Sequence, residues 1–306
     1  MTPLWRSLQY VPAHIEKYTT STRILAADAI ILDLQDSVPA GAKEQARAMA
    51  VALVPRLVGA GPDILVRINE GERGRADLDA VAIGGVQAIV VPQVRAPEEL
   101  QEIDRRLSEI EAVRGLPPGS VGLLPLIESA AGLLRMAAIA GASPRVRAIN
   151  LGNEDLAADL GVEPEADALL VPRQLLLIAA RAANVLPLGL IASGAGFHDI
   201  DSYRALVERS RRLGSRGASC IHPSQIAVLN EVFAPGEAER AWAARVLEAA
   251  ASAGPEQGAF ALDGRMIDAP ILARARNVLA RLEAIHNRDR RGAHAPARAL
   301  QPSDRE

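Results

Sequence analysis

The sequence predicts an α/β fold built as a (β/α)8 TIM barrel with a C-terminal helical lid segment. Short apolar runs alternate with amphipathic helical stretches, which is the pattern of βα units and a parallel sheet. Eight such runs occur, which is the number of strands that closes a barrel. The length of 306 residues, of which 49% are hydrophobic, fits one barrel with a modest extension.

Each expected strand is a short apolar run bounded by turn residues, as in a sheet that is buried on both faces. The eight expected strands are Ser7 to Pro12, Ala29 to Leu34, Ile64 to Asn69, Ala88 to Pro92, Gly122 to Glu128, Val146 to Gly152, Leu186 to Ala192 and Ala218 to His222. Helical patterns such as Glu98 to Val113 and Val171 to Ala183 lie between them. Glycine and proline punctuate the junctions, as in Leu116 to Gly119.

The chain divides into three expected parts. Residues 1–225 form the barrel that carries the metal site. Residues 226–286 form the lid segment, which is too short for an independent core and must pack on the barrel or on a neighbouring subunit. Residues 287–306 are polar and rich in Arg, Pro and Gly, and are expected to be disordered.

Composition excludes several classes of protein. A net charge of −3 with mixed signs gives no indication of a nucleic-acid partner. The sequence has neither an apolar run long enough for a membrane span nor the pattern of a secretory signal. Cys220 is the single cysteine, which excludes an intramolecular disulfide and suits a reducing compartment. We therefore expect a cytoplasmic location.

The ionisable residues narrow the chemistry further. Lys17 and Lys43 are the only lysines, and Lys43 lies in a charged stretch that is expected to be solvated, which disfavours a Schiff base. Lys17 follows the first strand and suits an anion contact. The histidines are scattered without the spacing of a zinc site: His14, His198, His222, His286 and His294. Carboxylates that bind an oxygen-preferring ion such as Mg²⁺ remain open.

Acidic residues follow two consecutive strands. Glu128 follows residues 122–127, and Glu154 and Asp155 follow residues 146–151. The C-terminal ends of strands are where barrel enzymes carry their catalytic groups. The alternative is that each acid begins a helix, where the helix dipole favours negative charge. Because acids recur on consecutive strands, the pattern favours a hard-metal site.

Arg67 is a guanidinium within an apolar strand, so it must meet a carboxylate or an anionic ligand. Structural pairing with Asp33 or Asp36, at the end of the second strand, is the alternative to a role in binding. Asp268 precedes Ala-Pro and a helical pattern, so by position alone it is an N-cap.

Several segments together resemble one known family. The chain is similar to the citrate lyase β-subunit and HpcH/HpaI aldolase superfamily, in the branch that holds malyl-CoA, citramalyl-CoA and citryl-CoA lyases. The matching segments occur in family order and are Arg6 to Pro12, Ala27 to Val38, Val66 to Asn69, Pro125 to Ala131, Leu151 to Gly161, Cys220 to Ile226 and Gly264 to Asp268. The resemblance implies a (β/α)8 barrel with a C-terminal lid, assembled as a homotrimer or homohexamer.

The resemblance also implies roles for individual residues. Glu128 and Asp155 match the family's Mg²⁺ ligands, with Mn²⁺ as an alternative ion. Arg67 matches the substrate-binding arginine, and Asp268 matches an acid that a neighbouring subunit's lid contributes. The remaining substrate and CoA contacts are expected at Arg6, Lys17 and Asp36.

The expected function is therefore a Mg²⁺-dependent carbon–carbon lyase that cleaves or forms a β-hydroxyacyl-CoA of malyl or citramalyl type. The products of cleavage are a 2-oxo acid and an acyl-CoA. One alternative is a malyl-CoA-type thioesterase or a CoA-independent 2-oxo acid aldolase. A further alternative is a non-catalytic subunit that binds a thioester.

The chain departs from the family pattern at several positions. Gln35 replaces an acid, and Ala218 and Ser219 stand where a basic residue commonly precedes Cys220. Residues 187–193 lack an acid often seen after the proline, and residues 14–22 are poorer in basic side chains than usual. These departures concern CoA recognition and substrate identity more than metal binding.

Overall fold

The computed structural model describes residues 3–19, 21–196, 198–253 and 259–293. The described residues fall into two compact units, one up to Phe233 and one from Ala234. Each unit is described below by itself. Among the described residues, no helix combines the length and apolar composition needed to cross a membrane.

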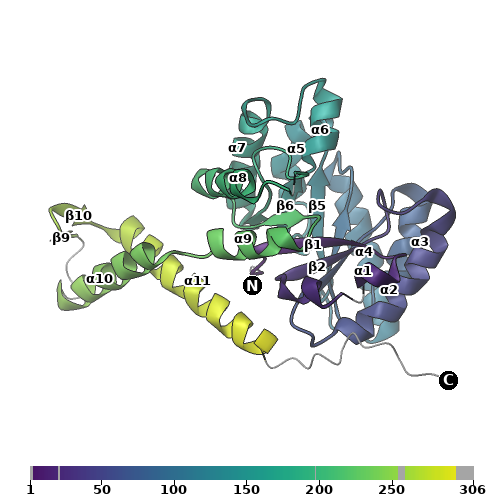
Figure 1. Cartoon of the computed structure of the whole chain (residues 1–306), viewed down its shortest axis with the longest axis horizontal. Helices are drawn as coiled ribbons and strands as arrows, with labels where there is room; N and C mark the ends of the chain where they lie inside the picture. The colour runs from purple at the N-terminus through teal and green to yellow at the C-terminus, as the bar shows by residue number, and fades with distance from the viewer. Residues whose placement is uncertain (1–2, 20, 197, 254–258, 294–306) are drawn as a thin grey trace. The chain divides into compact units, whose positions relative to one another are not determined.

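The first unit alternates strands and helices along the chain, as the apolar runs predict (Figure 1). Its elements are β1 (Ser7–Pro12), α1 (Glu16–Thr19), η1 (Thr22–Ala26), β2 (Ala29–Asp33), η2 (Ala40–Ala42), α2 (Lys43–Leu57), β3 (Asp63–Arg67), α3 (Gly71–Val81), β4 (Val86–Val91), α4 (Pro97–Arg114), β5 (Gly122–Ile127), α5 (Ala130–Ala140), β6 (Ala148–Leu151), α6 (Asn153–Leu160), α7 (Ala166–Ala183), β7 (Leu186–Pro187), α8 (Ile200–Leu213), β8 (Ala218–Cys220) and α9 (Ser224–Val232).

The eight strands form one curled parallel sheet in the order β7-β6-β5-β4-β3-β2-β1-β8. Backbone hydrogen bonds also join its two edges. The N–H of Arg216 donates to the carbonyl of Pro187 at 3.0 Å, and the N–H of Gly189 donates to the carbonyl of Gly217 at 2.8 Å. This α/β architecture is consistent with a TIM-barrel-like fold.

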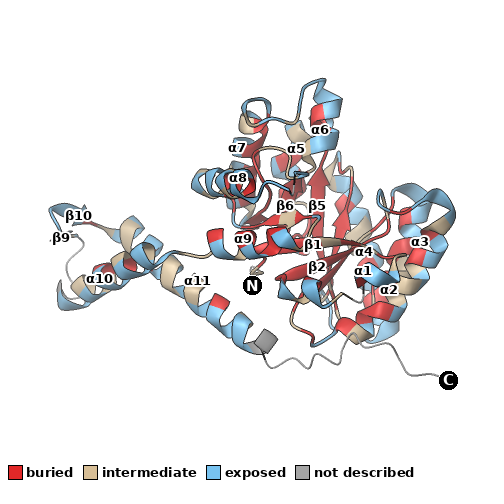
Figure 2. Ribbon diagram, viewed as in Figure 1, coloured by how far each residue is buried: buried red, intermediate tan, exposed pale blue. Residues whose placement is uncertain are grey.

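The strands of the sheet are largely buried (Figure 2). Their apolar side chains belong to two separate clusters. One cluster combines strand residues such as Ile30 and Val66 with helix residues such as Leu53 and Leu100. The other cluster consists mainly of alternate strand residues and lies inside the curl: Leu8, Ile31, Leu65, Val90, Leu124, Leu126 and Ala148 are among its members. Alternation along each strand therefore decides which side chains point toward the inside.

The strand boundaries differ from the expected ones mainly at the end of the sheet. The seventh strand was expected to reach Ala192, but β7 contains only Leu186–Pro187, although the N–H groups of Leu188 and Gly189 still donate to the carbonyls of Ile149 and Gly217. The helix α9 packs with Tyr203 and Cys220 in a cluster of the first unit. The boundary expected at residue 225 therefore lies after Phe233.

The second unit contains two helices and a hairpin. They are α10 (Glu237–Ala253), β9 (Phe260–Leu262), β10 (Arg265–Ile267) and α11 (Ala269–Ala293), with β9 and β10 antiparallel. Their small core includes Ala243, Val246, Ile267 and Ala275. The helix α11 continues to Ala293 and so enters the segment from residue 287 that was expected to be disordered. Residues 294–306 lie outside the described residues.

Candidate active site

A cavity of about 490 Å³ lies at the C-terminal ends of the strands. It gathers side chains from six strands or the residues that follow them: Tyr10, Asp33, Arg67, Glu128, Asn150 and Cys220. Asp36 and Asp155, from the segments after β2 and β6, also line it. This is the location that a barrel enzyme uses for its chemistry.

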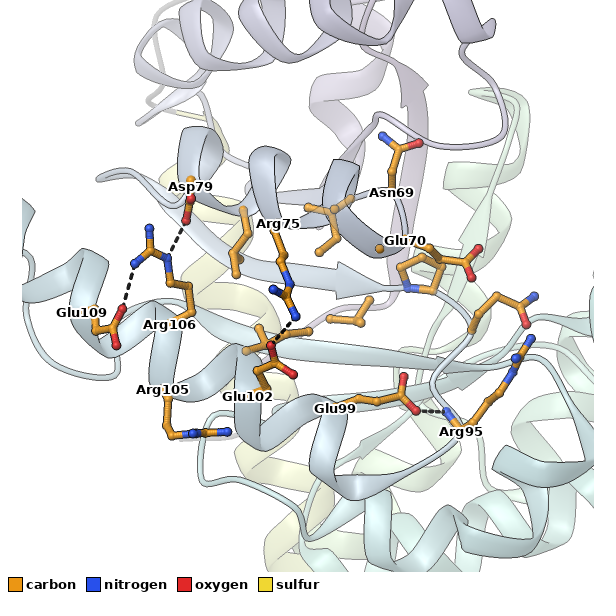
Figure 3. A pocket seen from close by; sticks show the side chains of 18 residues that line it. Asn69, Glu70, Arg75, Asp79, Arg95, Glu99, Glu102, Arg105, Arg106 and Glu109 are labelled. Carbon is orange, nitrogen blue, oxygen red and sulfur yellow. Dashed lines mark hydrogen bonds and ion pairs between the residues drawn. The ribbon is translucent and has the colours of Figure 1, made fainter.

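A larger cavity of about 760 Å³ lies between α3 and α4 (Figure 3). Charged side chains cross it in pairs. Arg75 bonds to Glu102 at 2.7 Å, and Arg106 bonds to Asp79 at 2.7 Å and to Glu109 at 2.8 Å. Exposed pairs of this kind contribute little to stability and leave few charges for a ligand. We therefore take the smaller cavity, which collects the acids at the strand ends, as the candidate site.

Arg67 forms a two-point ion pair with Asp33. Its Nε and Nη2 atoms each lie 2.7 Å from a carboxylate oxygen of Asp33, and Nη1 lies 3.1 Å from Asp36. Burial alone would raise the pKa of Asp33, but hydrogen bonds from Arg67 and Ser37 hold it below its usual value. The structural pairing considered as an alternative is therefore present. The guanidinium still lines the cavity and lies 4.8 Å from the centre of the Tyr10 ring.

Glu128 is the buried carboxylate of the site, with only 4% of its surface exposed. The backbone N–H of Gln93 donates to its Oε2 at 2.7 Å. A Cβ atom on Gly152 would lie 2.3 Å from Oε1 of Glu128, so the carboxylate occupies space that only glycine leaves free. Burial, together with the negative charge of Asp155, raises the pKa of Glu128 to about 7.

Asp155 lies in the first turn of α6 and is exposed. Burial of the carboxyl group and the charge of Asp36 raise its pKa. Glu154 lies in the same turn and also lines the cavity. Glu154 and Asp155 therefore begin a helix, as the alternative expects, and they also line the cavity, while a metal site at these acids stays a prediction.

The donor set fits a hard divalent cation. Glu128 and Asp155 repel each other electrostatically within one cavity, and a cation between them would relieve that repulsion. Among the described residues, no group of three or more His, Cys, Asp and Glu side chains is placed so that it could hold a metal ion. Mg²⁺ commonly uses one or two carboxylates and completes its octahedron with water and substrate oxygens. Glu128 and Asp155 are therefore of the residue type and number that fit Mg²⁺, and their role as its ligands stays a prediction.

Arg6 and Lys17, which were predicted to contact substrate or CoA, lie at opposite ends of the strands. Arg6 precedes β1 and forms an ion pair of 2.8 Å with Asp28, which precedes β2, so it lies at the opposite end of the strands from the cavity. Lys17 is exposed on α1, directly after the C-terminal end of β1. Of these two residues, only Lys17 lies at the end of the sheet that carries the site.

Asp268 belongs to the second unit. Its Oδ1 accepts a hydrogen bond of 3.4 Å from the N–H of Ile271 at the start of α11. This is the N-cap geometry expected from position alone. A catalytic role for Asp268 stays a prediction.

Comparison with known proteins identifies the family. A model of the family "HpcH/HpaI aldolase/citrate lyase" matches residues 6–223. The chain belongs to the HpcH/HpaI aldolase/citrate lyase family. The citrate lyase subunit beta of Escherichia coli K12 is 36% identical over 286 residues, covering 91% of this chain and 93% of the relative.

Members of the family with other names are almost as similar. A (3S)-malyl-CoA thioesterase of Cereibacter sphaeroides is 35% identical over 288 residues, covering 92% of this chain and 95% of the relative. The crystal structure of CitE from Mycobacterium tuberculosis with magnesium, acetoacetate and coenzyme A superposes with a TM-score of 0.72. That structure is 29% identical and covers 92% of this chain and 98% of its own.

In this family member, sequence reasoning missed three polar residues near the site. Tyr10 and Asn150 line the cavity from β1 and β6. Each follows an apolar residue of the inner cluster by two positions, Leu8 and Ala148 respectively, so alternation along the strand could have placed both side chains on the inside. Lys43 was expected to be solvated, but it is only 9% exposed, and its Nζ donates to the carbonyls of Leu34 and Gln35. It holds the loop after β2 and does not line the cavity.

Proposed function

We propose that this protein is a Mg²⁺-dependent carbon–carbon lyase of citrate lyase β type. It would cleave or form a β-hydroxyacyl-CoA of malyl or citramalyl type, with a 2-oxo acid and an acyl-CoA as the other partners. One observation carries the proposal: the buried Glu128, whose pKa is raised to about 7, shares a cavity with Asp155 and Arg67. The magnesium, acetoacetate and coenzyme A bound to the relative from Mycobacterium tuberculosis support it.

The residues divide the work of the reaction. When bound by Glu128 and Asp155, Mg²⁺, or Mn²⁺ in its place, would act as a Lewis acid toward the oxygens of the 2-oxo acid. Arg67 donates hydrogen bonds to the thioester oxygen, which gains negative charge as the carbon–carbon bond breaks. Asp33 fixes the plane of the guanidinium through its two bonds of 2.7 Å. Preorganised donors of this kind stabilise charge without rearranging during the reaction.

Proton transfer is the role proposed for Asp268. Cleavage removes the proton of the hydroxyl group, and the enolate carbon that is left must gain one. Asp268, on the second unit as a lid segment, would accept the hydroxyl proton and deliver it to the enolate carbon. Delivery across subunits of a homotrimer or homohexamer would exclude water until substrate is bound.

A thioesterase is the second candidate, because a (3S)-malyl-CoA thioesterase is 35% identical over nearly the whole chain. The same groups would then admit water to the thioester and release free CoA. A CoA-independent aldolase would act on free 2-oxo acids, and a non-catalytic subunit would bind the thioester unchanged.

Product analysis separates these activities. Purified protein with Mg²⁺ is incubated with malyl-CoA, citramalyl-CoA and citryl-CoA, and 2-oxo acid, acyl-CoA and free CoA are quantified. The lyase forms 2-oxo acid and acyl-CoA in equal amounts. Release of free CoA without formation of the shorter acyl-CoA product identifies the thioesterase. The absence of 2-oxo acid from every thioester contradicts the lyase.

Variants assign the roles in the same assay. Glu128→Gln and Arg67→Lys are expected to lower the rate by about 100-fold or more, because the first removes a proposed ligand of Mg²⁺ and the second removes the guanidinium that donates to the thioester oxygen. Asp268→Asn should lower the rate to a similar extent. Arg75→Gln, which breaks an exposed ion pair outside the cavity, serves as the control and should match the wild type. Wild-type activity in Asp268→Asn contradicts its role in proton transfer.

A further inference from the structure

The side of the cavity that follows β7 has no regular secondary structure. β7 ends at Pro187, and residues 188–192, the β7 wall, continue without helix or strand geometry. Gly189, Leu190 and Ala192 of this wall line the candidate site. Residues 188–191 are buried, so the backbone carbonyls of the wall need hydrogen-bond donors that a neighbouring strand would otherwise supply.

Two side chains from neighbouring helices supply these donors. Nδ2 of Asn153, on α6, donates to the carbonyls of Leu190 at 3.1 Å and Ala192 at 2.7 Å. Nη1 and Nη2 of Arg173, on α7, donate to the carbonyls of Leu188 and Leu190, both at 2.6 Å. Alternate carbonyls of the β7 wall are therefore bound by side chains of α6 and α7.

Arg173 makes this attachment strong because its charge is buried. The residue is fully buried, and no carboxylate lies within ion-pair distance of it among the described residues. Its Nε has no hydrogen-bond partner, and its other nitrogens contact neutral oxygens of Leu188, Leu190 and Asn153. A buried cation is costly unless such oxygens solvate it. Opening the β7 wall would remove two of them, so the buried charge favours the closed wall.

Asn153 joins the β7 wall to an acid of the candidate metal site. It is the first residue of α6, and Asp155 lies two residues further along in the same turn. Oδ1 of Asn153 accepts a hydrogen bond of 3.1 Å from Nη2 of Arg173, while Nδ2 holds the wall. A guanidinium has only donors, so it determines which end of the amide faces it. The bonds that hold the wall therefore also hold the turn that carries Asp155.

We propose that Asn153 and Arg173 are positioning residues that couple Mg²⁺ binding at Asp155 to the order of the β7 wall. The inference rests on the metal site of the proposed function and adds two residues to which no metal contact is assigned. A Mg²⁺ ion that holds Asp155 also holds the turn beside it and, through Asn153, the wall. Coupling of this kind is reciprocal, so a loose wall weakens Mg²⁺ binding by the same factor. Mg²⁺ thus completes the wall of the cavity before substrate enters.

Hydrogen exchange of the full-length protein, measured by mass spectrometry with and without Mg²⁺, tests the coupling. The N–H of Ile191 in the wall donates to Oγ of Ser210 at 3.0 Å, so its exchange reports opening of the wall. In the wild type, Mg²⁺ should slow exchange of residues 188–192 by about three- to tenfold, which corresponds to one hydrogen bond. In Asn153→Ala, Mg²⁺ should change this exchange by less than about twofold.

Calorimetric titration measures the reciprocal effect. Asn153→Ala should raise the Kd of Mg²⁺ by about three- to tenfold. Ser210→Ala is the matched control, because Ser210 bonds to Ile191 and Leu206 but not to α6. It should speed exchange of the wall, but keep the slowing by Mg²⁺ and a Kd within about twofold of the wild type. An effect of Mg²⁺ on the wall that is absent from the wild type, or that survives in Asn153→Ala, overturns the inference.

Arg173→Lys tests whether Arg173 acts through Asn153. Lysine keeps the positive charge but lacks the planar fork that reaches several oxygens at once. It should raise the Kd of Mg²⁺ by about threefold or more in the wild-type background, and by less than about twofold in the Asn153→Ala background. An equal loss in both backgrounds is what a general structural effect produces, and it would contradict the role of Arg173.

The outcome also distinguishes this inference from the proposed function. If Mg²⁺ slows exchange in the β7 wall but no β-hydroxyacyl-CoA is cleaved, only the lyase proposal is contradicted. If the thioesters are cleaved but exchange in the wall does not respond to Mg²⁺, only the coupling is contradicted.

Discussion

The backbone N–H of Gln93 donates a 2.7 Å hydrogen bond to Glu128, and Gln93 does so from a left-handed conformation with a φ of 52°. Such a conformation is strained for a residue with a side chain and persists where the surrounding structure requires it. Here the residues that follow β4 deliver a donor to the buried carboxylate of the candidate metal site. Backbone strain in one segment thus supports the charge of a residue on the next strand.

Substitution of Gln93 tests the strain. Gln93→Gly should leave the free energy of unfolding unchanged or raise it by up to about 1 kcal/mol, because glycine tolerates a positive φ. Gln93→Val should lower it by about 1 to 3 kcal/mol. Urea denaturation measures both. Gln101→Val, at an exposed position of α4, is the control and should cost less than about 1 kcal/mol. Equal losses in the two valine variants would contradict strain at Gln93.

Mg²⁺ binding should depend on pH through Glu128. Its pKa is raised from 4.5 to about 7, mainly by burial. Mg²⁺ must displace the proton, so the affinity should rise with pH until about 7 and then level off. Calorimetric titration between about pH 5.5 and 8 measures this rise. An affinity that does not change with pH would contradict the assignment of Glu128 as a ligand.

The same shift has the opposite sign for the stability of the metal-free protein. The folded state binds the proton of Glu128 more tightly than the unfolded state does. The stabilisation that this protonated carboxyl group gives to the folded state is therefore fully present below pH 4.5 and is lost as the pH rises through about 7. The expected loss is about 3 kcal/mol. Glu128→Gln cannot ionise, so the metal-free variant should be more stable than the wild type at pH 8. Denaturation in EDTA measures the difference.

Gly152→Ala should separate metal binding from folding. The added Cβ atom would lie 2.3 Å from Oε1 of Glu128, so the Glu128 carboxylate must move from its present place in the cavity that Asp155 also lines. We expect Mg²⁺ affinity to fall by about tenfold or more, while circular dichroism stays that of the wild type. Gly41→Ala is the matched control, because a Cβ there has no neighbour within 4 Å. Wild-type Mg²⁺ affinity in Gly152→Ala would argue against Glu128 as a ligand.

A buried network remote from the cavity should control acid stability. Glu111 accepts hydrogen bonds from Arg145 Nη1 at 2.8 Å and Nη2 at 2.7 Å. Burial would raise the pKa of Glu111, but these bonds and those from Val121 and Gly119 lower it to about 2. Its contribution is therefore present above pH 4.5 and is lost as the pH falls toward 2.

The variant Glu111→Gln should lower the free energy of unfolding at pH 7 by about 2 to 4 kcal/mol, since it leaves Arg145 with a weaker partner. The difference in unfolding free energy between the variant and the wild type should shrink as the pH falls below about 4. Urea denaturation at pH 7 and at about pH 3 measures it. Mg²⁺ affinity should stay that of the wild type. A difference at pH 3 that is as large as the difference at pH 7 would contradict this origin of the acid sensitivity.

The positions of strands and the acids that follow them could be predicted from the sequence, because both depend on local patterns. Apolar runs located all eight strands, and the acids at 128 and 155 line one cavity as expected. The pairing of Arg67 with Asp33 and Asp36 was foreseen as an alternative, since a buried guanidinium needs a carboxylate.

The remaining features depend on contacts between distant residues. Arg6 was expected to contact CoA, but its partner Asp28 precedes the next strand, and the pair is recognisable only when β1 and β2 lie side by side. The burial of Lys43 arises from the path of the loop after β2, which supplies two carbonyls. The closeness of Asn150 to Gly189 and Arg173 likewise depends on the fold, because these residues lie far apart in the sequence.

The first strand of the sheet, β1, pairs with its last strand, β8, and this has a consequence for synthesis of the chain. The first strand pairs with β8, and Cys220 Sγ donates to Oε1 of Gln9 across 211 positions of sequence. On a ribosome, β1 must wait for almost the whole first unit before its neighbour emerges. Until then its free edge can pair with other nascent chains, and a product truncated before residue 218 exposes that edge permanently. We therefore expect slow folding from this high contact order, with aggregation as the fate of truncated products.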